Sequence, residues 1–479
     1  MNWETVIGFE VHCELMTASK VWCGCSTAFG QAPNTQVCPI CLGMPGVLPV
    51  LNRRAMELSM RAALALNCAI TRDAQFERKN YYYPDLPKNY QISQLRKNLG
   101  VDGWFELPTD DGAKRIGIHN VHLEEDAGKN IHPDDPGADY SLVDLNRAGT
   151  PLLEIVTEPD LRSAAEAETL MKAMKNLLEY TEVSDCNMHE GRLRFELNIS
   201  VRPEGSQTLG TKVEVKNLNS IRVALKCIEV EQHRQIAELE AGGRVVQETR
   251  LWDETTGRTR SMRTKEVAHD YRYFPDPDLV QMEIDDAWID RVRAENPELP
   301  EARRNRFITN FGLSEYDAGV LTAQKAMADY YECAVAAHQN PKAVGNWIMT
   351  EALRWLGEDA DREFEDYPIP AQGLAELVKL IDDGTISGKI AKEVYKGMMA
   401  GEGAPGEIVK ARGLVQITDA STIDPIVTEV IANNPDAVAK IKAGKERAVG
   451  ALVGQVMKAT RGKANPKLVN ELILEKIKD

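Results

Sequence analysis

The chain has 479 residues, which is too long for one ordinary domain, because a single hydrophobic core rarely grows beyond roughly 250 to 300 residues. Its composition, 43% hydrophobic and 27% charged, is that of a globular protein. No apolar run approaches the roughly 18 residues that a membrane span needs, so we exclude a membrane-spanning protein. The N-terminus, Met1-Asn2-Trp3-Glu4, has neither the basic stretch nor the apolar core of a signal peptide, and we expect a cytoplasmic location.

The formal net charge of −16 argues at first sight against a nucleic-acid partner, because phosphate binding depends on Lys and Arg. The charge is unevenly distributed. Residues 401–479 hold 12 basic and 10 acidic residues, a net charge of +2, which leaves −18 for residues 1–400. Between Lys440 and Lys467 a single acid, Glu446, stands against eight basic residues: Lys440, Lys442, Lys445, Arg447, Lys458, Arg461, Lys463 and Lys467. This segment predicts a small basic surface on an acidic body, with a solvated helix face as the alternative.

Residues near the N-terminus alternate in character, which indicates a β-strand, because successive strand side chains point to opposite faces. Glu10, His12 and Glu14 share one face, and the intervening residues are apolar. The same alternation recurs over 193–202 and 212–216. Strands with one apolar and one charged face are typical of antiparallel or mixed sheets that helices cover on one side. We therefore predict an α+β fold for the first 290 residues.

Helical patterns interrupt and then replace the strands. A capping box of Ser163 and Glu166 introduces a predicted helix over 164–180, which we expect to back the sheet. Helical periodicity dominates from about residue 300 to residue 400. The glycine-rich segment 401–406 then predicts a hinge before a last helical segment of about seventy residues.

Four of the nine cysteines, Cys23, Cys25, Cys38 and Cys41, lie close together in the sequence. The spacing forms two short knuckles, and a thiolate quartet in a reducing compartment favours tetrahedral zinc over disulfides. Four protein ligands would close the site, so its role would be structural. The alternative is four unrelated buried thiols.

Carboxylates could meet on the charged face of the predicted sheet. Glu10, His12 and Glu14 lie about 7 Å apart along their strand, and Glu124, Glu125, Glu196 and Glu214 are available from other predicted strands. Several carboxylates on one surface repel one another and call for a hard divalent cation, for which Mg²⁺ with water ligands is suited. A solvated strand face is the alternative for the first three residues.

Basic groups occur beside these acids, including Lys79, Lys212 and Lys216. Acids, metal and bases together suggest phosphate handling. No G-x-x-x-x-G-K-[ST] motif is present, which excludes a P-loop NTPase. Ordinary surface ion pairs are the alternative explanation for single Lys or Arg residues.

Several strings of residues carry a resemblance to a known family. They are Glu4-Thr5-Val6-Ile7-Gly8-Phe9-Glu10-Val11-His12, Arg78-Lys79-Asn80-Tyr81, Glu124-Glu125-Asp126-Ala127-Gly128-Lys129, Ser141-Leu142-Val143-Asp144-Leu145-Asn146-Arg147 and Asp270-Tyr271-Arg272-Tyr273-Phe274-Pro275. The chain resembles, essentially from end to end, the B subunits of the aspartyl/glutamyl-tRNA amidotransferase. The cysteine quartet occurs in only part of that family, so zinc is dispensable to the reaction.

The resemblance implies three domains: a catalytic cradle similar to glutamine synthetase over 1–293 with a zinc-knuckle insertion at 23–41, a helical domain over 294–405, and a tRNA-binding tail over 406–479. It also implies a reaction in which ATP phosphorylates the side chain of a Glu or Asp wrongly esterified to tRNA, and ammonia then displaces the phosphate. A glutaminase A subunit would supply the ammonia and a small C subunit would complete a heterotrimer, because we find no G-x-S-x-G motif or Ser- and Lys-bearing amidase signature in this chain.

Residue roles also follow from the resemblance. The implied catalytic set is Glu10, His12, Glu124, Glu125 and Glu214, of which Glu10, His12, Glu125 and Glu214 would bind magnesium; Lys79, Lys212 and Lys216 would contact ATP. Tyr81 would stack on the terminal adenosine of the tRNA, and Lys445, Arg447, Lys458, Arg461 and Lys463 would hold tRNA in the tail. We expect Tyr82 and Tyr83 to pack in the core. Two other functions stay open, a free-standing ATP-dependent ligase and a non-catalytic zinc-stapled tRNA-binding scaffold.

Overall fold

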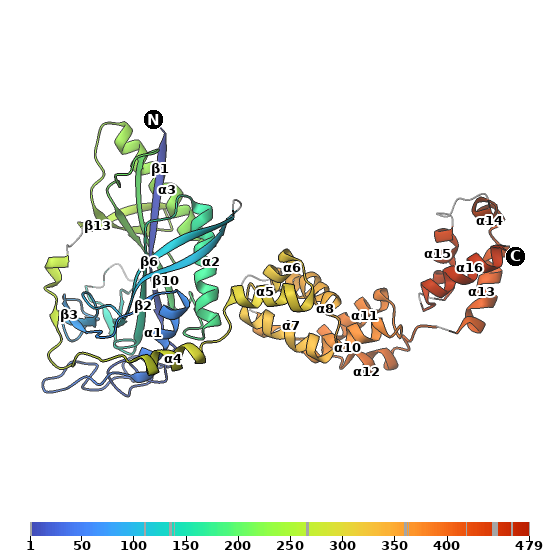
Figure 1. Ribbon diagram of the computed structural model, residues 1–479, viewed down its shortest axis with the longest axis horizontal. Helices are drawn as coiled ribbons and strands as arrows, with labels where there is room; N and C mark the ends of the chain where they lie inside the picture. Colours follow the sequence, from blue (N-terminus) through green and yellow to red (C-terminus); the bar gives the residue numbers. More distant parts are fainter. Residues whose placement is uncertain are drawn as a thin grey trace. The chain divides into compact units, whose positions relative to one another are not determined.

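The computed structural model describes residues 2–109, 112–133, 137, 139–264, 268–358, 362, 364–417, 419–442, 449–460 and 463–478. The chain divides into two compact units, Met1–Pro300 and Glu301–Asp479 (Figure 1). No helix within these described ranges combines the length and the apolar character that crossing a membrane requires. The three-domain division at residues 293 and 405 stays a prediction.

A mixed β-sheet forms the centre of the first unit. Within the described residues its strand order is β13-β12-β11-β10-β1-β9-β6-β5-β2. The strands are β1 (Trp3–Glu14), β2 (Ala69–Ile70), β5 (Gly100–Thr109), β6 (Gly112–Glu125), β9 (Pro151–Thr157), β10 (Leu193–Pro203), β11 (Val213–Lys216), β12 (Glu248–Asp253) and β13 (Arg258–Thr264). Paired neighbours are antiparallel apart from β11 and β12, which are parallel. The predicted mixed α+β architecture is therefore confirmed for this unit.

Helices pack against the apolar face of this sheet. They are α1 (Arg53–Ala65), α2 (Ala164–Tyr180) and α3 (Ile221–Glu240), and α4 (Asp286–Glu295) packs against α1 (Figure 1). The core between helices and sheet contains Phe9 and Val11 of β1, both buried. The predicted helix over 164–180 is confirmed: Ser163 accepts a hydrogen bond from the N–H of Glu166 at 3.1 Å. The Glu166 carboxylate accepts from the N–H of Arg162 rather than that of Ser163, so only one half of the predicted capping box forms.

Smaller elements complete the first unit. A three-stranded sheet has the order β14-β3-β4, built from β3 (Glu77–Asn80), β4 (Tyr90–Ser93) and β14 (Phe274–Pro275), and β4 lies beside β6. A hairpin joins β7 (Lys129–Ile131) to β8 (Leu142–Asp144), and a 3₁₀ turn covers Ala268–Tyr271. The irregular segment between β1 and α1 carries the four clustered cysteines.

The described part of the second unit is helical, as predicted from residue 300 onward. Its first helices are α5 (Pro300–Phe311), α6 (Glu315–Leu321), α7 (Lys325–Ala337), α8 (Pro341–Trp347), α9 (Leu353–Gly357), α10 (Ala371–Asp382), α11 (Gly388–Met399) and α12 (Pro405–Ala411), with a π-helical turn at Ile348–Ala352 and a 3₁₀ turn at Phe364–Asp366. Because α12 begins at Pro405 and packs against α10 and α11, the predicted hinge at 401–406 is wrong: the segment is a tight turn, in which Gly401 takes a φ of 74°.

Four further helices have an apolar core of their own. They are α13 (Ala420–Ala432), α14 (Pro435–Lys442), α15 (Val449–Ala459) and α16 (Pro466–Lys478). Ile423, Leu452 and Ile473 contribute to this core and are fully buried. The burial of these three side chains directs the polar faces of the same helices to the surface, where Lys458 of α15 is exposed, as is Lys440 of α14.

Candidate active site and metal centres

A first acid cluster lies on the polar face of the large sheet. Glu10 of β1 is paired directly with Glu196 of β10, and Glu214 of β11 is paired with the β10 residue Asn198. Because strand side chains alternate between faces, these three carboxylates point to the same side. One oxygen from each lies within 4.8 Å of the others.

A second cluster lies two residues further along β1, roughly 7 Å away by strand geometry. His12 is paired with Glu154 of β9, and one ligand atom from each of these residues and from Glu124 of β6 lies within 4.8 Å of the others. His122 contacts both acids, with its Nε2 at 3.2 Å from Glu154 and 3.7 Å from Glu124. Ser93 donates a hydrogen bond to Glu124 at 2.9 Å.

The first cluster concentrates negative charge. Burial, together with Glu154, Glu196 and Glu214, raises the pKa of Glu10, because each of these conditions disfavours the carboxylate. Lys216 partly offsets the charge, since its Nζ lies 2.6 Å from Glu196 and 3.1 Å from Glu214. Thr249 of β12 donates to Glu214 at 2.8 Å and so orients it.

Opposite charges dominate the second cluster. Burial would lower the pKa of His12, but Glu154 and Glu196 outweigh burial and raise it to about 9. Burial would also lower the pKa of His122, but Glu154 and Glu124 outweigh burial and raise this pKa to about 10. The two imidazoles in turn hold the pKa of Glu154 well below its usual range, against the effect of burial. These opposite charges stabilise the ionised form of the buried carboxylates in this cluster.

Both clusters fit a divalent cation. Carboxylate oxygens supply the hard ligands that Mg²⁺ prefers, and octahedral geometry with bonds of about 2.1 Å places ligand atoms within the observed separation. His12 keeps its Nδ1 buried without a hydrogen-bond partner in the described residues. Water molecules would complete the coordination, which suits a site that must also admit substrate oxygens.

A lysine from the small sheet faces the second cluster. Lys79 of β3 lies close enough to Glu124 and Glu154 to interact electrostatically with both, and its Nζ lies 5.0 Å from the centre of the Tyr271 ring. Burial would lower the pKa of Lys79, but Tyr273 and Glu124 outweigh it and raise the pKa. The side chain is therefore a fixed positive charge beside the acids.

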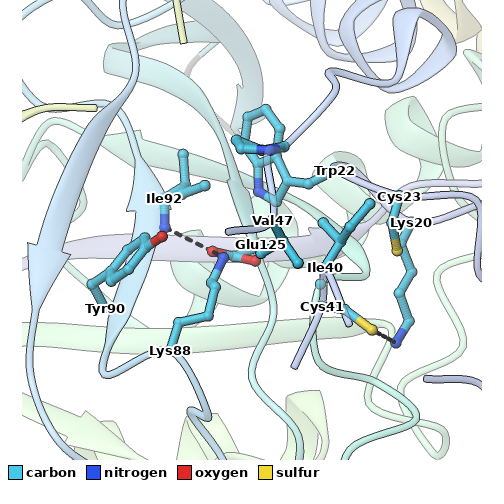
Figure 2. Close-up of a pocket in the computed structure, with 12 residues that line it drawn as sticks. Lys20, Trp22, Cys23, Ile40, Cys41, Val47, Lys88, Tyr90, Ile92 and Glu125 are labelled. Atoms are coloured by element: carbon cyan, nitrogen blue, oxygen red, sulfur yellow. Dashed lines mark hydrogen bonds and ion pairs between the residues drawn. The ribbon is translucent and has the colours of Figure 1, made fainter. Parts of the chain in front are cut away.

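Glu125 lies apart from the acids with which the sequence grouped it. Neighbouring residues of β6 point to opposite faces, so Glu124 joins His12, whereas Glu125 forms an ion pair with Lys88 and accepts a hydrogen bond from the N–H of Ile92 at 2.8 Å (Figure 2). It lines a small cavity together with Trp22 and the cysteine-bearing segment. The structure thus brings together Glu10, Glu214, His12 and Glu124 and leaves out Glu125.

The tyrosine run differs from expectation. Tyr81 is half-buried, donates to Gln91 at 3.3 Å and packs edge-on against Tyr83 and Tyr271. Tyr82 is 68% exposed and Tyr83 44% exposed. The prediction that these two residues pack in the core is therefore wrong, because the segment after β3 runs along the surface.

The four clustered cysteines come together as the spacing predicts. Their Sγ atoms all lie within 4.8 Å of one another, in Cys23, Cys25, Cys38 and Cys41. The Cys23 thiol, with the N–H of Cys38 and the ammonium of Lys20, lowers the pKa of Cys41 to about 4. Lys20 is buried and its Nζ lies 3.6 Å from the Cys41 sulfur (Figure 2). A low-pKa thiolate in a sulfur quartet is suited to Zn²⁺.

The remaining predicted residues have less defined settings. Lys212 is exposed and immediately precedes β11. Lys458 is exposed on α15, and Lys463 donates to the carbonyl of Gly413 at 2.6 Å. Lys445, Arg447 and Arg461 lie outside the described residues.

Sequence reasoning missed Glu154 as a site residue, and Glu196 was noticed only as a possible partner. The signal at Glu154 was a lone carboxylate in the otherwise apolar strand β9. His122 was likewise readable as a member of the same face, since it alternates with Glu124 in β6.

The mixed sheet carries the paired acid clusters, lysines lie beside them, and a helical region follows the sheet. Residues 5–290 match the family model described as the GatB/GatE catalytic domain, and residues 329–477 match the one described as the GatB domain. Over 477 residues the chain is 57% identical to the B subunit of the aspartyl/glutamyl-tRNA(Asn/Gln) amidotransferase of Moorella thermoacetica, covering 100% of both chains. It is 54% identical to that of Caldanaerobacter subterraneus subsp. tengcongensis, again over 100% of both, and 52% identical to that of Carboxydothermus hydrogenoformans over 99% of both.

The chain belongs to the family of aspartyl/glutamyl-tRNA(Asn/Gln) amidotransferase B subunits, as its sequence motifs indicated. It is thus an amidotransferase subunit, and amidotransferases of this kind are ligases.

Proposed function

We propose that the chain converts misacylated Glu-tRNA(Gln) to Gln-tRNA(Gln), or Asp-tRNA(Asn) to Asn-tRNA(Asn), in an ATP-dependent reaction. One observation carries the proposal: two clusters able to bind divalent cations lie side by side on β1, with Lys79 and Lys216 next to them. The names of the relatives supply the tRNA substrates. The sheet that bears the clusters acts as a cradle similar to that of glutamine synthetase.

The first step activates the substrate carboxylate. Two anions must meet, because the side-chain carboxylate of the aminoacyl group attacks the γ-phosphorus of ATP and releases ADP. Divalent cations held by the clusters of Glu10, Glu196 and Glu214 and of His12, Glu124 and Glu154 would screen both charges. Lys79, Lys212 and Lys216 would contact the phosphates, and the product is an acyl phosphate.

The second step replaces phosphate by nitrogen. Ammonia attacks the carbonyl carbon, phosphate leaves with the electrons of the broken C–O bond, and one proton is lost to give the amide. A glutaminase A subunit supplies the ammonia, and a small C subunit completes a heterotrimer that works in the cytoplasm with the translation machinery. The word subunit in the names of the relatives supports such an assembly.

Glu125 takes a role apart from the metals in this scheme. Its ion pair with Lys88 and its place on the opposite side of β6 from Glu124 support a role in shaping the site. The catalytic and magnesium roles that the resemblance suggested for Glu125 are therefore transferred to Glu154 in our proposal.

Zinc and tRNA binding complete the proposed function. The cysteine quartet would hold one structural Zn²⁺ and so fix the segment between β1 and α1. For tRNA, Tyr81 would border the terminal adenosine, and the basic residues of the tail, Lys445, Arg447, Lys458, Arg461 and Lys463, would contact the phosphate backbone.

An amidation assay tests the proposal against its two rivals. The complete enzyme is incubated with Glu-tRNA(Gln) or Asp-tRNA(Asn), ATP, Mg²⁺ and ammonium chloride, and the amino acid released from the tRNA is identified. We expect glutamine or asparagine only when ATP is present. A free-standing ligase would instead amidate the free amino acid, and a scaffold would bind tRNA without consuming ATP.

A further inference from the structure

Lys20 carries a charged side chain into the interior of the first unit. It precedes Cys23, the first of the clustered cysteines, by three residues, and none of its surface is exposed to solvent. Removing an ammonium group from water is costly unless an anion and other acceptors replace the water. The groups around its Nζ therefore indicate what this charge does.

Three acceptors surround the ammonium group of Lys20. Its Nζ donates to the carbonyl of Gln36 at 2.8 Å and to that of Leu145 at 3.4 Å, and it lies 3.6 Å from the Cys41 sulfur (Figure 2). These contacts use the three N–H bonds of a lysine. Within the described residues Lys20 forms no ion pair with a carboxylate, and Glu125, which lines the same cavity, is paired with Lys88. Among the three acceptors, only the sulfur can carry a negative charge.

The sulfur atoms are spaced for a tetrahedral metal ion. The Cys38 and Cys41 sulfurs lie 3.9 Å apart, and a tetrahedron with Zn–S bonds of about 2.3 Å places its sulfurs about 3.8 Å from one another. Four thiolate charges exceed the two positive charges of Zn²⁺, so the centre is a net anion. Cys41 is buried, whereas the other three cysteines are half-buried, so water screens the charge of Cys41 least.

The backbone holds Lys20 beside the quartet. Its N–H donates to the carbonyl of Cys25 at 2.9 Å, and its carbonyl accepts from the side chain of Asn52 at 3.3 Å. Lys20 thus contacts one cysteine pair through its backbone and the other, at Cys41, through its ammonium group. Residues on both sides of the quartet therefore determine where the charge lies.

We propose that Lys20 is the counter-ion of the cysteine quartet: its ammonium group donates a hydrogen bond to the Cys41 thiolate and compensates part of the negative charge of the zinc-bound thiolates. The proposal rests on the structural Zn²⁺ of the proposed function. Groups that hydrogen-bond to metal ligands typically change metal affinity about 10- to 100-fold. Lys20 thus raises the affinity for zinc without being a ligand.

The zinc affinity of Lys20→Met measures this contribution, because methionine keeps the length of the side chain and removes its charge. The zinc-loaded full chain is titrated with a chromophoric chelator that competes for the metal. We expect the affinity of Lys20→Met to fall by at least about tenfold, and Lys20→Arg, which keeps the charge, to recover part of the loss.

Lys88→Met is the matched control. The Lys88 side chain is 8% exposed and lines the same cavity, but it pairs with Glu125. Its loss should leave the zinc affinity at the wild-type value. Equal falls in Lys88→Met and Lys20→Met would refute the proposal, since the loss of any buried charge would then have the same effect.

Exchanging one ligand separates charge from packing. Cys41→His gives three thiolates and one imidazole, a set that zinc accepts, but it removes the thiolate at Lys20. On this background Lys20→Met should lower the zinc affinity little further, whereas on a Cys25→His background it should cost as much as in the wild type. A full loss on the Cys41→His background would overturn the proposal, because the effect would then not depend on the Cys41 thiolate.

Two results on the wild type do not depend on any variant folding. A crystal structure of the zinc-loaded chain should show the Lys20 Nζ in contact with the Cys41 sulfur, and an Nζ turned away from that sulfur would contradict the role of Lys20. Failure of the full chain to bind zinc would instead contradict the proposed zinc site itself.

Discussion

Replacing Glu231 by Gln should loosen the edge of the sheet that supports the first acid cluster. Glu231 of α3 is fully buried and accepts hydrogen bonds from Arg234 at 2.8 to 3.1 Å and from Thr259 of β13, while Arg250 of β12 lies 3.2 Å away. The carboxylate thus ties α3 to the β12–β13 hairpin. Through β12, the same hairpin pairs with β11, which carries Glu214.

The expected cost follows from burial and pairing. Removing one partner of a buried ion pair costs about 3 to 5 kcal/mol, and we expect the lower end because Arg234 is 30% exposed. A loss of about 3 kcal/mol corresponds to a roughly hundredfold faster amide exchange, since 1.4 kcal/mol is tenfold. Hydrogen exchange of β12 and β13 measures it directly, whereas global unfolding of a chain with two units need not be two-state.

Glu229→Gln on the same helix is the matched control, because that side chain is exposed. It should leave the exchange of both strands unchanged. The pKa of Glu231 adds a second readout: burial would raise it, but hydrogen bonds from Arg234 and Thr259 lower it below 4.5. Its stabilisation is therefore complete above about pH 4.5, is lost as the pH falls through the folded-state pKa, and should be absent from the Gln variant. Identical exchange in Glu231→Gln and Glu229→Gln would refute this reasoning.

Three further predictions concern metals and tRNA. Glu154→Gln should abolish Mg²⁺-dependent activity. Glu125→Gln should leave Mn²⁺ binding, measured calorimetrically, near that of the wild type. Weakened Mn²⁺ binding only in Glu125→Gln would reverse our assignment. Metal analysis should find about one zinc per chain, and Cys38→Ser should lower zinc content and thermal stability together, unlike the exposed control Cys333→Ser. Deleting residues 420–479, which have their own core, should weaken tRNA binding severely. The triple variant with Lys458→Glu, Arg461→Glu and Lys463→Glu should show a weaker dependence of tRNA affinity on salt concentration. An unchanged salt dependence would remove this role from the tail.

Period-two alternation predicted the strand faces well, because burial of one face enforces it. The apolar face of β1 is in the core, and Glu10 and His12 lie on the opposite face, as their spacing indicated. The sequence also predicted that the four cysteines come together, because their spacing along the chain sets the local geometry of the site. Local patterns of this kind determine which residues share a surface.

The sequence did not predict which distant strands would pair. Glu124 and Glu125 are neighbours in sequence, yet the alternation of β6 separates them, and the sequence grouped both with the metal site. Glu154 joins the second cluster only because β9 lies between β1 and β6. Likewise, glycines at 401–406 suggested a hinge, whereas the packing of α12 makes the segment a turn.

Trapping the acyl phosphate tests the central claim most directly. The complete enzyme is given Glu-tRNA(Gln), ATP and Mg²⁺ without a nitrogen donor, and hydroxylamine is added to capture the activated side chain as a hydroxamate on the tRNA. We predict ATP-dependent hydroxamate with the wild type and none with Glu214→Gln or Glu154→Gln. Hydroxamate formation by both variants at the wild-type rate would contradict the account, because the acid clusters would then not activate the carboxylate.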